Sequence, residues 1–131
     1  MTKKKILVID DLVGMTHLLK RNLEATNRYI VRTENTAAKS VAAAREFLPD
    51  LIILDIMMPD ASGDEIAARI KQDNRLNHIP IVFLSAIIKK EEVQSSGGHV
   101  GGLTILAKPV KLDDLINCIE GKLEGPARPA N

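Results

Sequence analysis

Five side chains with charged or reactive groups closely follow short apolar runs of the sequence. Asp10 and Asp11 follow one run, and Asp55 follows another. Ser85 comes directly after a further run, and Lys108 lies two residues beyond the last one. If the runs are parallel strands of one sheet, their carboxyl ends meet at the edge where open α/β sheets bind ligands. The sequence therefore predicts one site that contains three carboxylates, a hydroxyl and an ammonium group.

The composition of this predicted site indicates phosphoryl chemistry on a metal. Three neighbouring carboxylates repel one another unless a cation joins them, and oxygen ligands of this kind suit Mg²⁺. A lysine beside such a site is explained if a further anion, such as a phosphoryl group, must also be held. A carboxylate can accept that group covalently as an aspartyl phosphate. Mg²⁺ and the lysine would then neutralise the charge on the transferring oxygens.

Short apolar runs predict the strands that would carry these side chains. The runs are rich in aliphatic and β-branched residues and do not alternate with polar ones, which is typical of strands buried on both faces. The strong runs are residues 6–9, 51–54, 81–84 and 103–106, and a weaker run at 29–32 predicts an edge strand.

Helical spacing of apolar residues appears between the runs. The predicted helices contain a stripe at Met15, Leu18, Leu19 and Leu23, a segment after the N-cap Thr36, a segment after the turn 59–63, a short stretch at 89–95, and a final stripe at 112–123. Strands that alternate with helices favour right-handed crossovers. We therefore expect a three-layer α/β domain with a parallel sheet covered by helices on both faces.

The composition limits the functions open to the chain. The length of 131 residues fits one domain, and residues 125–131 have no apolar periodicity and are predicted to be a disordered tail or the start of a linker. With 2% aromatic residues and a net charge of +1, direct nucleic-acid binding is not expected. A single cysteine, Cys118, and no apolar run long enough for a signal or a membrane span favour a cytoplasmic protein. His17, His78 and His99 lack metal-ligand spacing and are predicted to lie at the surface.

Taken together, these motifs resemble the receiver domain of response regulators in two-component signal transduction. The resemblance covers about residues 4 to 123. Its motifs are the acidic pair Asp10-Asp11, the stretch from Leu51 through Asp55 to Pro59, Gly63, Ser85-Ala86 and Lys108-Pro109, in the order of the family. It implies a receiver domain at residues 1–124 with a flavodoxin-like fold, a (βα)5 arrangement whose five parallel strands have the order 2-1-3-4-5.

The resemblance also implies a role for each site residue. Asp55 would accept a phosphoryl group from a sensor histidine kinase or a histidine phosphotransfer protein. Asp11, Asp55 and the backbone carbonyl of Met57 would bind Mg²⁺ directly, while Asp10 would act mainly through water. Lys108 would pair with the phosphoryl oxygens, Ser85 would move to bond one of them, and the Lys108-Pro109 peptide is expected to be cis. An output protein or downstream domain would read the change, while the oligomeric state stays open.

Three positions depart from, or modify, the family pattern. Ile105 stands where receiver domains usually carry a tyrosine or phenylalanine, so we expect the output surface to respond through the glycine-rich segment 97–102 instead. Met57 and Ile87 flank the approach of water to the acyl phosphate. Since both are apolar and cannot orient water, slow self-dephosphorylation is predicted.

Other interpretations of the same residues are less well supported. A phosphatase with an aspartyl-phosphate intermediate would usually carry a second aspartate at position 57, which is methionine here. A flavin-binding protein of the same fold is disfavoured by the acidic edge and the scarcity of aromatic residues. A degenerate receiver, acting as an interaction module without phosphorylation, stays the main alternative. In the leading interpretation the domain catalyses only its own phosphorylation and dephosphorylation and is not otherwise an enzyme.

Overall fold

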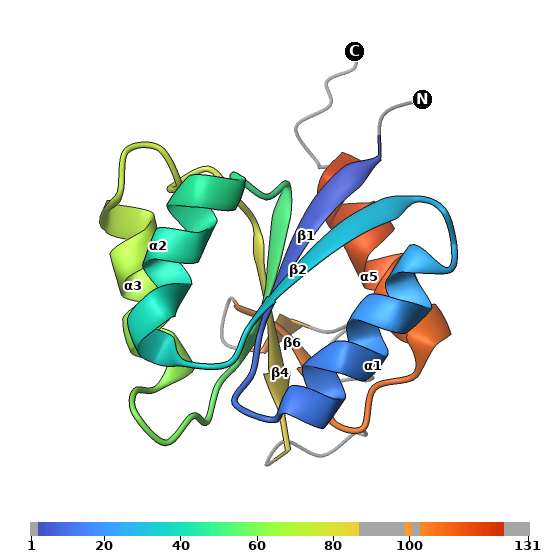
Figure 1. The fold of residues 1–131 in the computed structure, drawn as a ribbon, viewed down its shortest axis with the longest axis horizontal. Coiled ribbons are helices and arrows are strands. Elements are labelled where there is room, and N and C mark those ends of the chain that lie inside the picture. The colour runs from blue at the N-terminus through green and yellow to red at the C-terminus, as the bar shows by residue number, and fades with distance from the viewer. Residues whose placement is uncertain (1–2, 87–98, 101–102, 125–131) are drawn as a thin grey trace.

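The computed structural model describes residues 3–86, 99–100 and 103–124, and it forms three layers around a central sheet (Figure 1). The strands are β1 (Lys4–Ile9), β2 (Tyr29–Glu34), β3 (Leu51–Asp55), β4 (Ile81–Ser85), β5 (His99–Val100) and β6 (Leu103–Ala107). The helices are α1 (Val13–Glu24), α2 (Ala37–Phe47), α3 (Gly63–Gln72) and α5 (Leu112–Glu124). The predicted helix at 89–95 and the predicted tail at 125–131 lie outside the described residues.

The sheet has the order β2-β1-β3-β4-β6-β5. Its first five strands are parallel and correspond to the predicted order 2-1-3-4-5, which confirms the flavodoxin-like topology, with β2 at one edge. The structure adds β5, a two-residue strand that pairs antiparallel with β6 at the other edge. Two residues are too few to leave an apolar pattern, so the sequence gives no sign of it.

Each face of the sheet is covered by a pair of helices. Successive side chains of a strand point to opposite faces, so apolar strands place hydrophobic side chains on both faces of the sheet. Ile6 and Val8 of β1 pack in one cluster with Leu19 of α1 and Leu115 of α5. Leu7 and Ile9 pack on the other face, in a cluster that includes the buried residues of α2 and α3. Figure 1 shows the two helix pairs on opposite sides of the strands.

The apolar stripe of α1 differs from the predicted one. Leu19 and Leu23 are buried, but the Leu18 side chain is 53% exposed, and Thr16 takes a buried place in the helix. The prediction for Leu18 was therefore wrong. Spacing indicates which residues share a side of a helix, but it does not show how far around the helix the contact with the sheet extends.

Thr36 is the N-cap of α2, as predicted, but its side chain makes no capping hydrogen bond. The backbone N–H of Ala37 instead donates to Oδ2 of Asp60, at 3.0 Å, from the loop between β3 and α3. This contact brings a distant loop to the start of α2. No described helix is both long enough and apolar enough to cross a bilayer.

Candidate acidic site at the carboxyl edge of the sheet

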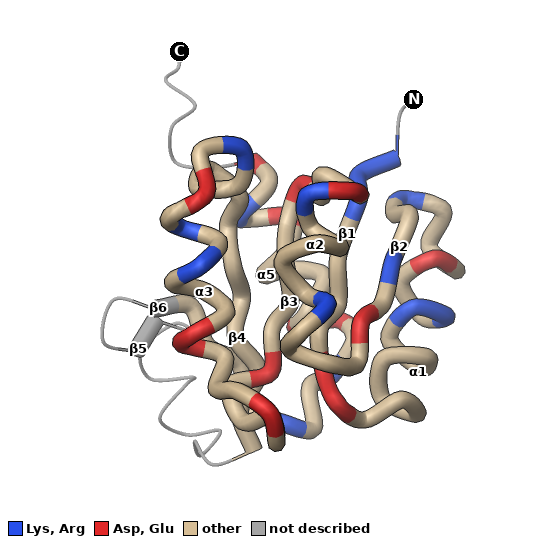
Figure 2. Tube along the Cα trace, turned by 60° about the vertical axis from the view of Figure 1, so that its left-hand side comes forward, with Lys and Arg blue, Asp and Glu red and all other residues tan. Residues whose placement is uncertain are grey.

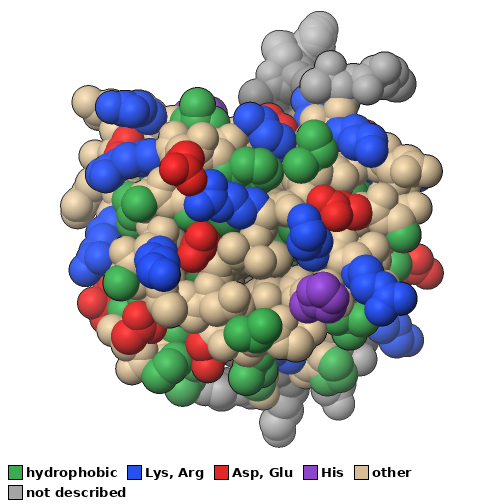
Figure 3. Space-filling model, in the orientation of Figure 1, with side chains coloured by type: hydrophobic (Ala, Val, Ile, Leu, Met, Phe, Trp, Pro, Cys, Tyr) green, Lys and Arg blue, Asp and Glu red, His purple; other side chains and the backbone are tan. Residues whose placement is uncertain are grey.

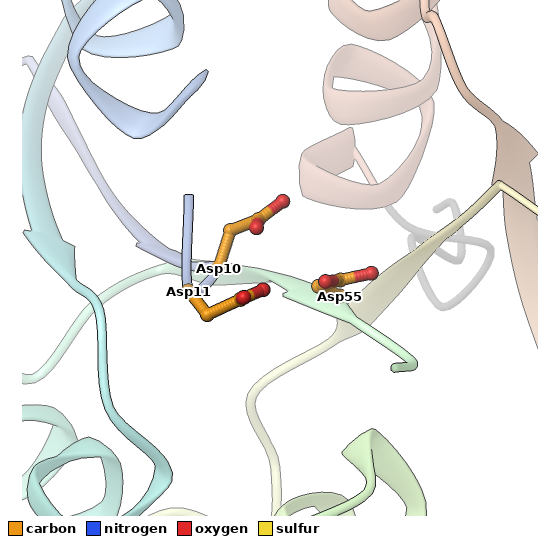
Figure 4. A group of neighbouring side chains, drawn as sticks. All are labelled: Asp10, Asp11 and Asp55. Atoms are coloured by element: carbon orange, nitrogen blue, oxygen red, sulfur yellow. The ribbon is translucent and has the colours of Figure 1, made fainter. Parts of the chain in front are cut away.

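The carboxyl ends of β1 and β3 bring three aspartates together. One carboxylate oxygen from each of Asp10, Asp11 and Asp55 lies within 4.8 Å of the others. Figure 4 shows the Asp10 and Asp11 side chains extending from the end of β1 toward the side on which Asp55 lies. In Figure 2, acidic segments lie at this lower end of the strands, opposite the chain's N-terminus. The predicted convergence of carboxylates is therefore present in the fold.

Asp10 is fully buried, and both its carboxylate and its backbone carbonyl accept hydrogen bonds. Its Oδ1 accepts the N–H of Leu12 at 3.0 Å, and its Oδ2 accepts Nζ of Lys108 at 2.8 Å. Its backbone carbonyl accepts Nδ2 of Asn35 at 2.8 Å. Both carboxylate oxygens thus already accept hydrogen bonds within the protein.

Asp11 differs from its neighbour. It is half-buried, and within the described part of the chain its side chain makes no hydrogen bond or ion pair. Its carboxylate therefore keeps its lone pairs for a ligand, next to an oxygen of Asp55. The set of donors is oxygen only, which fits a hard divalent cation such as Mg²⁺.

Lys108 joins two of the aspartates. Its Nζ lies 2.8 Å from Oδ2 of Asp10 and 3.2 Å from Oδ1 of Asp55. Although burial alone would lower the pKa of the ammonium, hydrogen bonds and charge from Asp10 and Asp55 raise it overall. The side chain enters the site from the end of β6, where the Lys108-Pro109 peptide is cis, as predicted. Lys108 is thus a fixed positive charge beside Asp55.

Asp55 is the last residue of β3, and it is only 4% exposed. Burial raises the pKa of its carboxyl, and the nearby charge of Asp10 raises it further, while Lys108 opposes both effects. The N–H of Met57 lies 3.4 Å from Oδ1 of Asp55. A cation placed between Asp11 and Asp55 would favour the charged form of the Asp55 carboxyl and so oppose both effects that raise its pKa.

Ser85 is buried at the end of β4, the strand beside β3. Its neighbour Leu84 pairs with Asp55 in the sheet, so Ser85 lies one residue beyond the level of the carboxylate. Its backbone carbonyl accepts the N–H of Lys108 at 2.8 Å. The ends of β4 and β6, which carry Ser85 and Lys108, are therefore joined to each other beside the end of β3 that carries Asp55.

Gly63 explains why the loop after Asp55 can fold closely over the strand end. A Cβ atom at this position would lie 2.6 Å from the backbone oxygen of Asp55 and 2.9 Å from Cα of Ile56. The glycine N–H donates to the carbonyl of Ile56 at 2.7 Å. Ser62 and Glu65 form a capping box at the start of α3, which fixes the far end of this loop.

Two residues of this region were not predicted from the sequence: Asn35 and Asp60. Asn35 directly follows β2, so the strand-end rule that selected the aspartates could also have selected it. Asp60 follows no strand, and its contact with Ala37 leaves no local pattern.

The remaining predicted residues lie away from the acidic cluster or outside the described side chains. His17 and His78 are exposed, as expected, whereas the side chain of His99 and all of Ile87 are not among the described residues. Cys118 is half-buried on α5, and burial raises the pKa of its thiol. Ile105 is 5% exposed and packs in the cluster beneath α2 and α3.

Comparison with known proteins agrees with the fold. The family model of the response regulator receiver domain matches residues 6–120. The chain therefore belongs to the response regulator receiver family of two-component systems.

Two relatives differ in how much of their own length this chain matches. The polar-differentiation response regulator DivK of Brucella anthropi is 31% identical over 122 residues, covering 92% of this chain and 96% of DivK. The response regulator PleD of Caulobacter vibrioides is 34% identical over 112 residues, which cover 86% of this chain but only 24% of PleD. The chain thus spans nearly all of DivK and about a quarter of PleD.

Solved structures show the same fold. A CheY-like receiver domain protein from Methanospirillum hungatei matches with a TM-score of 0.77 at 26% identity, covering 94% of this chain and 95% of that one. The chemotaxis protein CheY4 of Vibrio cholerae matches with a TM-score of 0.76 at 24% identity, covering 91% of this chain and 98% of that one.

Proposed function

We propose that Asp55 is the phosphoacceptor of a signalling switch and that the reaction requires Mg²⁺. The observation that carries the proposal is the position of Lys108, whose ammonium lies 3.2 Å from Asp55 while a carboxylate of Asp11 stays open beside it. A site built only to bind a metal would not need a lysine whose side chain is only 12% exposed beside the carboxylates. A site that must also hold a phosphoryl group would.

The proposed reaction is an in-line transfer from a phosphohistidine. A carboxylate oxygen of Asp55 attacks phosphorus, the phosphorus–nitrogen bond of the donor breaks, and the leaving imidazole takes up a proton from solvent water. Lys108 stays in place and shifts its hydrogen bonds from Asp55 to the transferred oxygens, and Ser85 donates to another of them. Mg²⁺ held by Asp11, Asp55 and the carbonyl of Met57 would neutralise charge on those oxygens.

The donor would be a sensor histidine kinase or a histidine phosphotransfer protein, in the cytoplasm. Apolar side chains next to the acidic residues support docking of such a protein: Leu12, Val13 and Met57 are 54%, 65% and 57% exposed. Figure 3 shows hydrophobic side chains along the lower edge of the molecule, the end of the strands at which the acidic segments lie. An output protein or downstream domain would then distinguish the phosphorylated form. We propose no turnover of a free substrate beyond this transfer.

Intact-mass measurement after incubation with acetyl phosphate and MgCl₂ tests the proposal. We expect one phosphoryl adduct on the wild-type chain and none on Asp55→Asn or without Mg²⁺. Asp113→Asn, which removes an exposed carboxylate from α5, is the matched control and should be modified like the wild type. If neither acetyl phosphate nor a phosphorylated histidine kinase gives an adduct, the degenerate-receiver interpretation replaces this one.

A further inference from the structure

The connection between β2 and α2 contacts both loops that carry the acidic residues. We call residues 35–37 of this connection the brace. Asn35 reaches the loop after β1, where its Nδ2 donates to the carbonyl of Asp10 at 2.8 Å and to Oγ1 of Thr16 at 3.0 Å. Ala37 reaches the loop after β3, where its N–H meets Oδ2 of Asp60 at 3.0 Å. Three consecutive residues therefore link the two sides of the site.

The bond from Asn35 fixes the peptide that leads into Asp11. The carbonyl of Asp10 belongs to the same planar unit as the N–H of Asp11. The N–H of Asp10 is held as well, because it donates to the carbonyl of Glu34 at 3.1 Å. With both backbone groups of Asp10 engaged, the direction in which the Asp11 side chain leaves the backbone is set by β2 and its continuation.

Asp11 depends on this backbone control more than its neighbours do. Asp10 and Asp55 share Lys108, whereas in the described part of the chain the Asp11 side chain has no partner that would orient it. A carboxylate without side-chain partners can serve as a ready ligand only if its backbone is held. Thr16 adds to that hold, since it is buried and donates to the carbonyl of Val13 at 3.1 Å.

Asp60 provides the second anchor. It lies five residues after Asp55, and its carboxylate takes over the capping of α2 that the side chain of Thr36 does not perform. The loop that contains Met57 is thereby tied to the same short segment that holds the Asp10–Asp11 peptide.

We propose that Asn35 is a positioning residue for the cation site, and that the brace sets the spacing of the Asp11 and Asp55 loops through Asn35 and Asp60. This inference rests on the proposed function, because it assumes that Asp11 and Asp55 bind a divalent cation. Neither Asn35 nor Asp60 would touch the metal. Both would act through the backbone that carries its ligands, as outer-shell partners of metal ligands commonly do.

Titration of the metal-free chain with MgCl₂ in an isothermal calorimeter tests the proposed role of the brace. We expect Asn35→Ala to raise the Kd for Mg²⁺ by on the order of tenfold. Asp60→Ala should raise it as well, whereas Asp60→Asn, which keeps an oxygen to accept the N–H of Ala37, should stay close to the wild type. Asn77→Ala is the matched control, because Asn77 is exposed and away from the site.

Two further measurements separate positioning from a general loss of structure. The Tm of each variant is measured without metal, and Asp73→Ala serves as a destabilised control, since it breaks the ion pair with Arg45 far from the acidic cluster. A double-mutant cycle with Asp11→Asn then asks whether Asn35 acts through Asp11, in which case Asn35→Ala should add little once Asp11 is changed.

The outcomes distinguish this inference from the function beneath it. A wild-type chain that binds Mg²⁺ while Asn35→Ala and Asp60→Ala bind it equally well overturns the proposed role of the brace alone, even if the Tm of these two variants falls. Additive effects of Asn35→Ala and Asp11→Asn also overturn it. A wild-type chain that binds no Mg²⁺ overturns the proposed cation site, and the brace with it.

Discussion

At the scale of single residues, the site depends on the close packing of the loop after Asp55 against the end of β3 as much as on charge. Asp55 ends a buried strand, and the loop after it turns back so tightly that only a hydrogen atom fits at the Cα of Gly63. The family motif includes a glycine here, and the structure supplies its reason. A side chain at this position would press on the backbone of the phosphoacceptor candidate.

Gly63→Ala is therefore expected to disturb both stability and chemistry. The new methyl group would meet the Asp55 carbonyl oxygen at 2.6 Å, so the loop must shift, at a cost of roughly 1–3 kcal/mol in the free energy of unfolding. Phosphorylation by acetyl phosphate should slow as well, because the carboxylate moves with its backbone. Urea unfolding and the rate of adduct formation measure the two effects.

The control for this variant is another helical glycine. A Cβ at Gly121 in α5 would meet nothing within 4 Å, so Gly121→Ala should be neutral or stabilising by up to about 1 kcal/mol. Equal losses in the two alanine variants would show that the tight turn at Gly63 has no special role.

At the scale of elements, α1 protects the open edge of the sheet. β2 is an edge strand, and the outward-facing N–H and carbonyl of Val31 would otherwise be free to pair with another chain. Glu24 accepts that N–H at 3.0 Å, and Lys20 donates to that carbonyl at 2.8 Å. The two side chains also form an ion pair with each other at 3.2 Å, so the last turns of α1 cover the middle of the edge.

Glu24→Ala should lower stability in a manner that depends on pH. The hydrogen bond from Val31, followed by the effect of Lys20, lowers the pKa of the Glu24 carboxyl below 4.5. A carboxyl whose pKa falls on folding stabilises the native state above its unfolded pKa and loses that effect as the pH falls through the folded value. We expect the free energy of unfolding of Glu24→Ala to be about 1 kcal/mol lower than that of the wild type at neutral pH. This difference should shrink below pH ~4, and thermal unfolding at several pH values measures it.

The comparison variant is Glu46→Ala, which removes an ion pair with Arg32 from a side chain that is 71% exposed. Exposed pairs of this kind contribute little, so its Tm should change less than that of Glu24→Ala. If the loss of unfolding free energy in Glu24→Ala stays the same at acid pH, the charge on Glu24 does not contribute to stability.

At the scale of the whole molecule, one hydrogen bond joins the edge strand to the last helix. The hydroxyl of Tyr29 on β2 donates to Oε2 of Glu120 on α5. Tyr29 is 1% exposed and belongs to the cluster that packs α1 and α5 against the sheet. Burial, together with the hydrogen bond to Glu120, raises the pKa of the phenol to about 12.

Tyr29 is the only tyrosine, so its ionisation can be followed directly by ultraviolet absorbance. An acid whose pKa rises on folding loses its stabilising effect as the pH rises, so the native state should weaken from pH 10 toward pH 12. We expect the folded chain to titrate near 12 and Glu120→Gln to titrate lower. Equal midpoints in the two proteins would mean that Glu120 does not contribute.

The parallel sheet and the acidic cluster could be predicted from the sequence because both follow from short-range patterns. Buried runs identify the strands, and Asp10, Asp11 and Asp55 directly follow those runs. Contacts between a side chain and the backbone of a distant segment could not be predicted from the sequence. Asn35 and Asp10 are 25 residues apart, and Ala37 and Asp60 are 23 apart, and neither bond leaves a periodic signal.

The contact between Tyr29 and Glu120 also has a consequence for how the chain is made. The two residues are 91 positions apart, so at ~5–20 residues per second the tyrosine is synthesised several seconds before its partner. During that interval the face of the sheet that α5 covers would expose Val8, Leu51 and Ile53 to solvent. In a nascent chain this face of the sheet is therefore expected to be completed only after α5 has been synthesised.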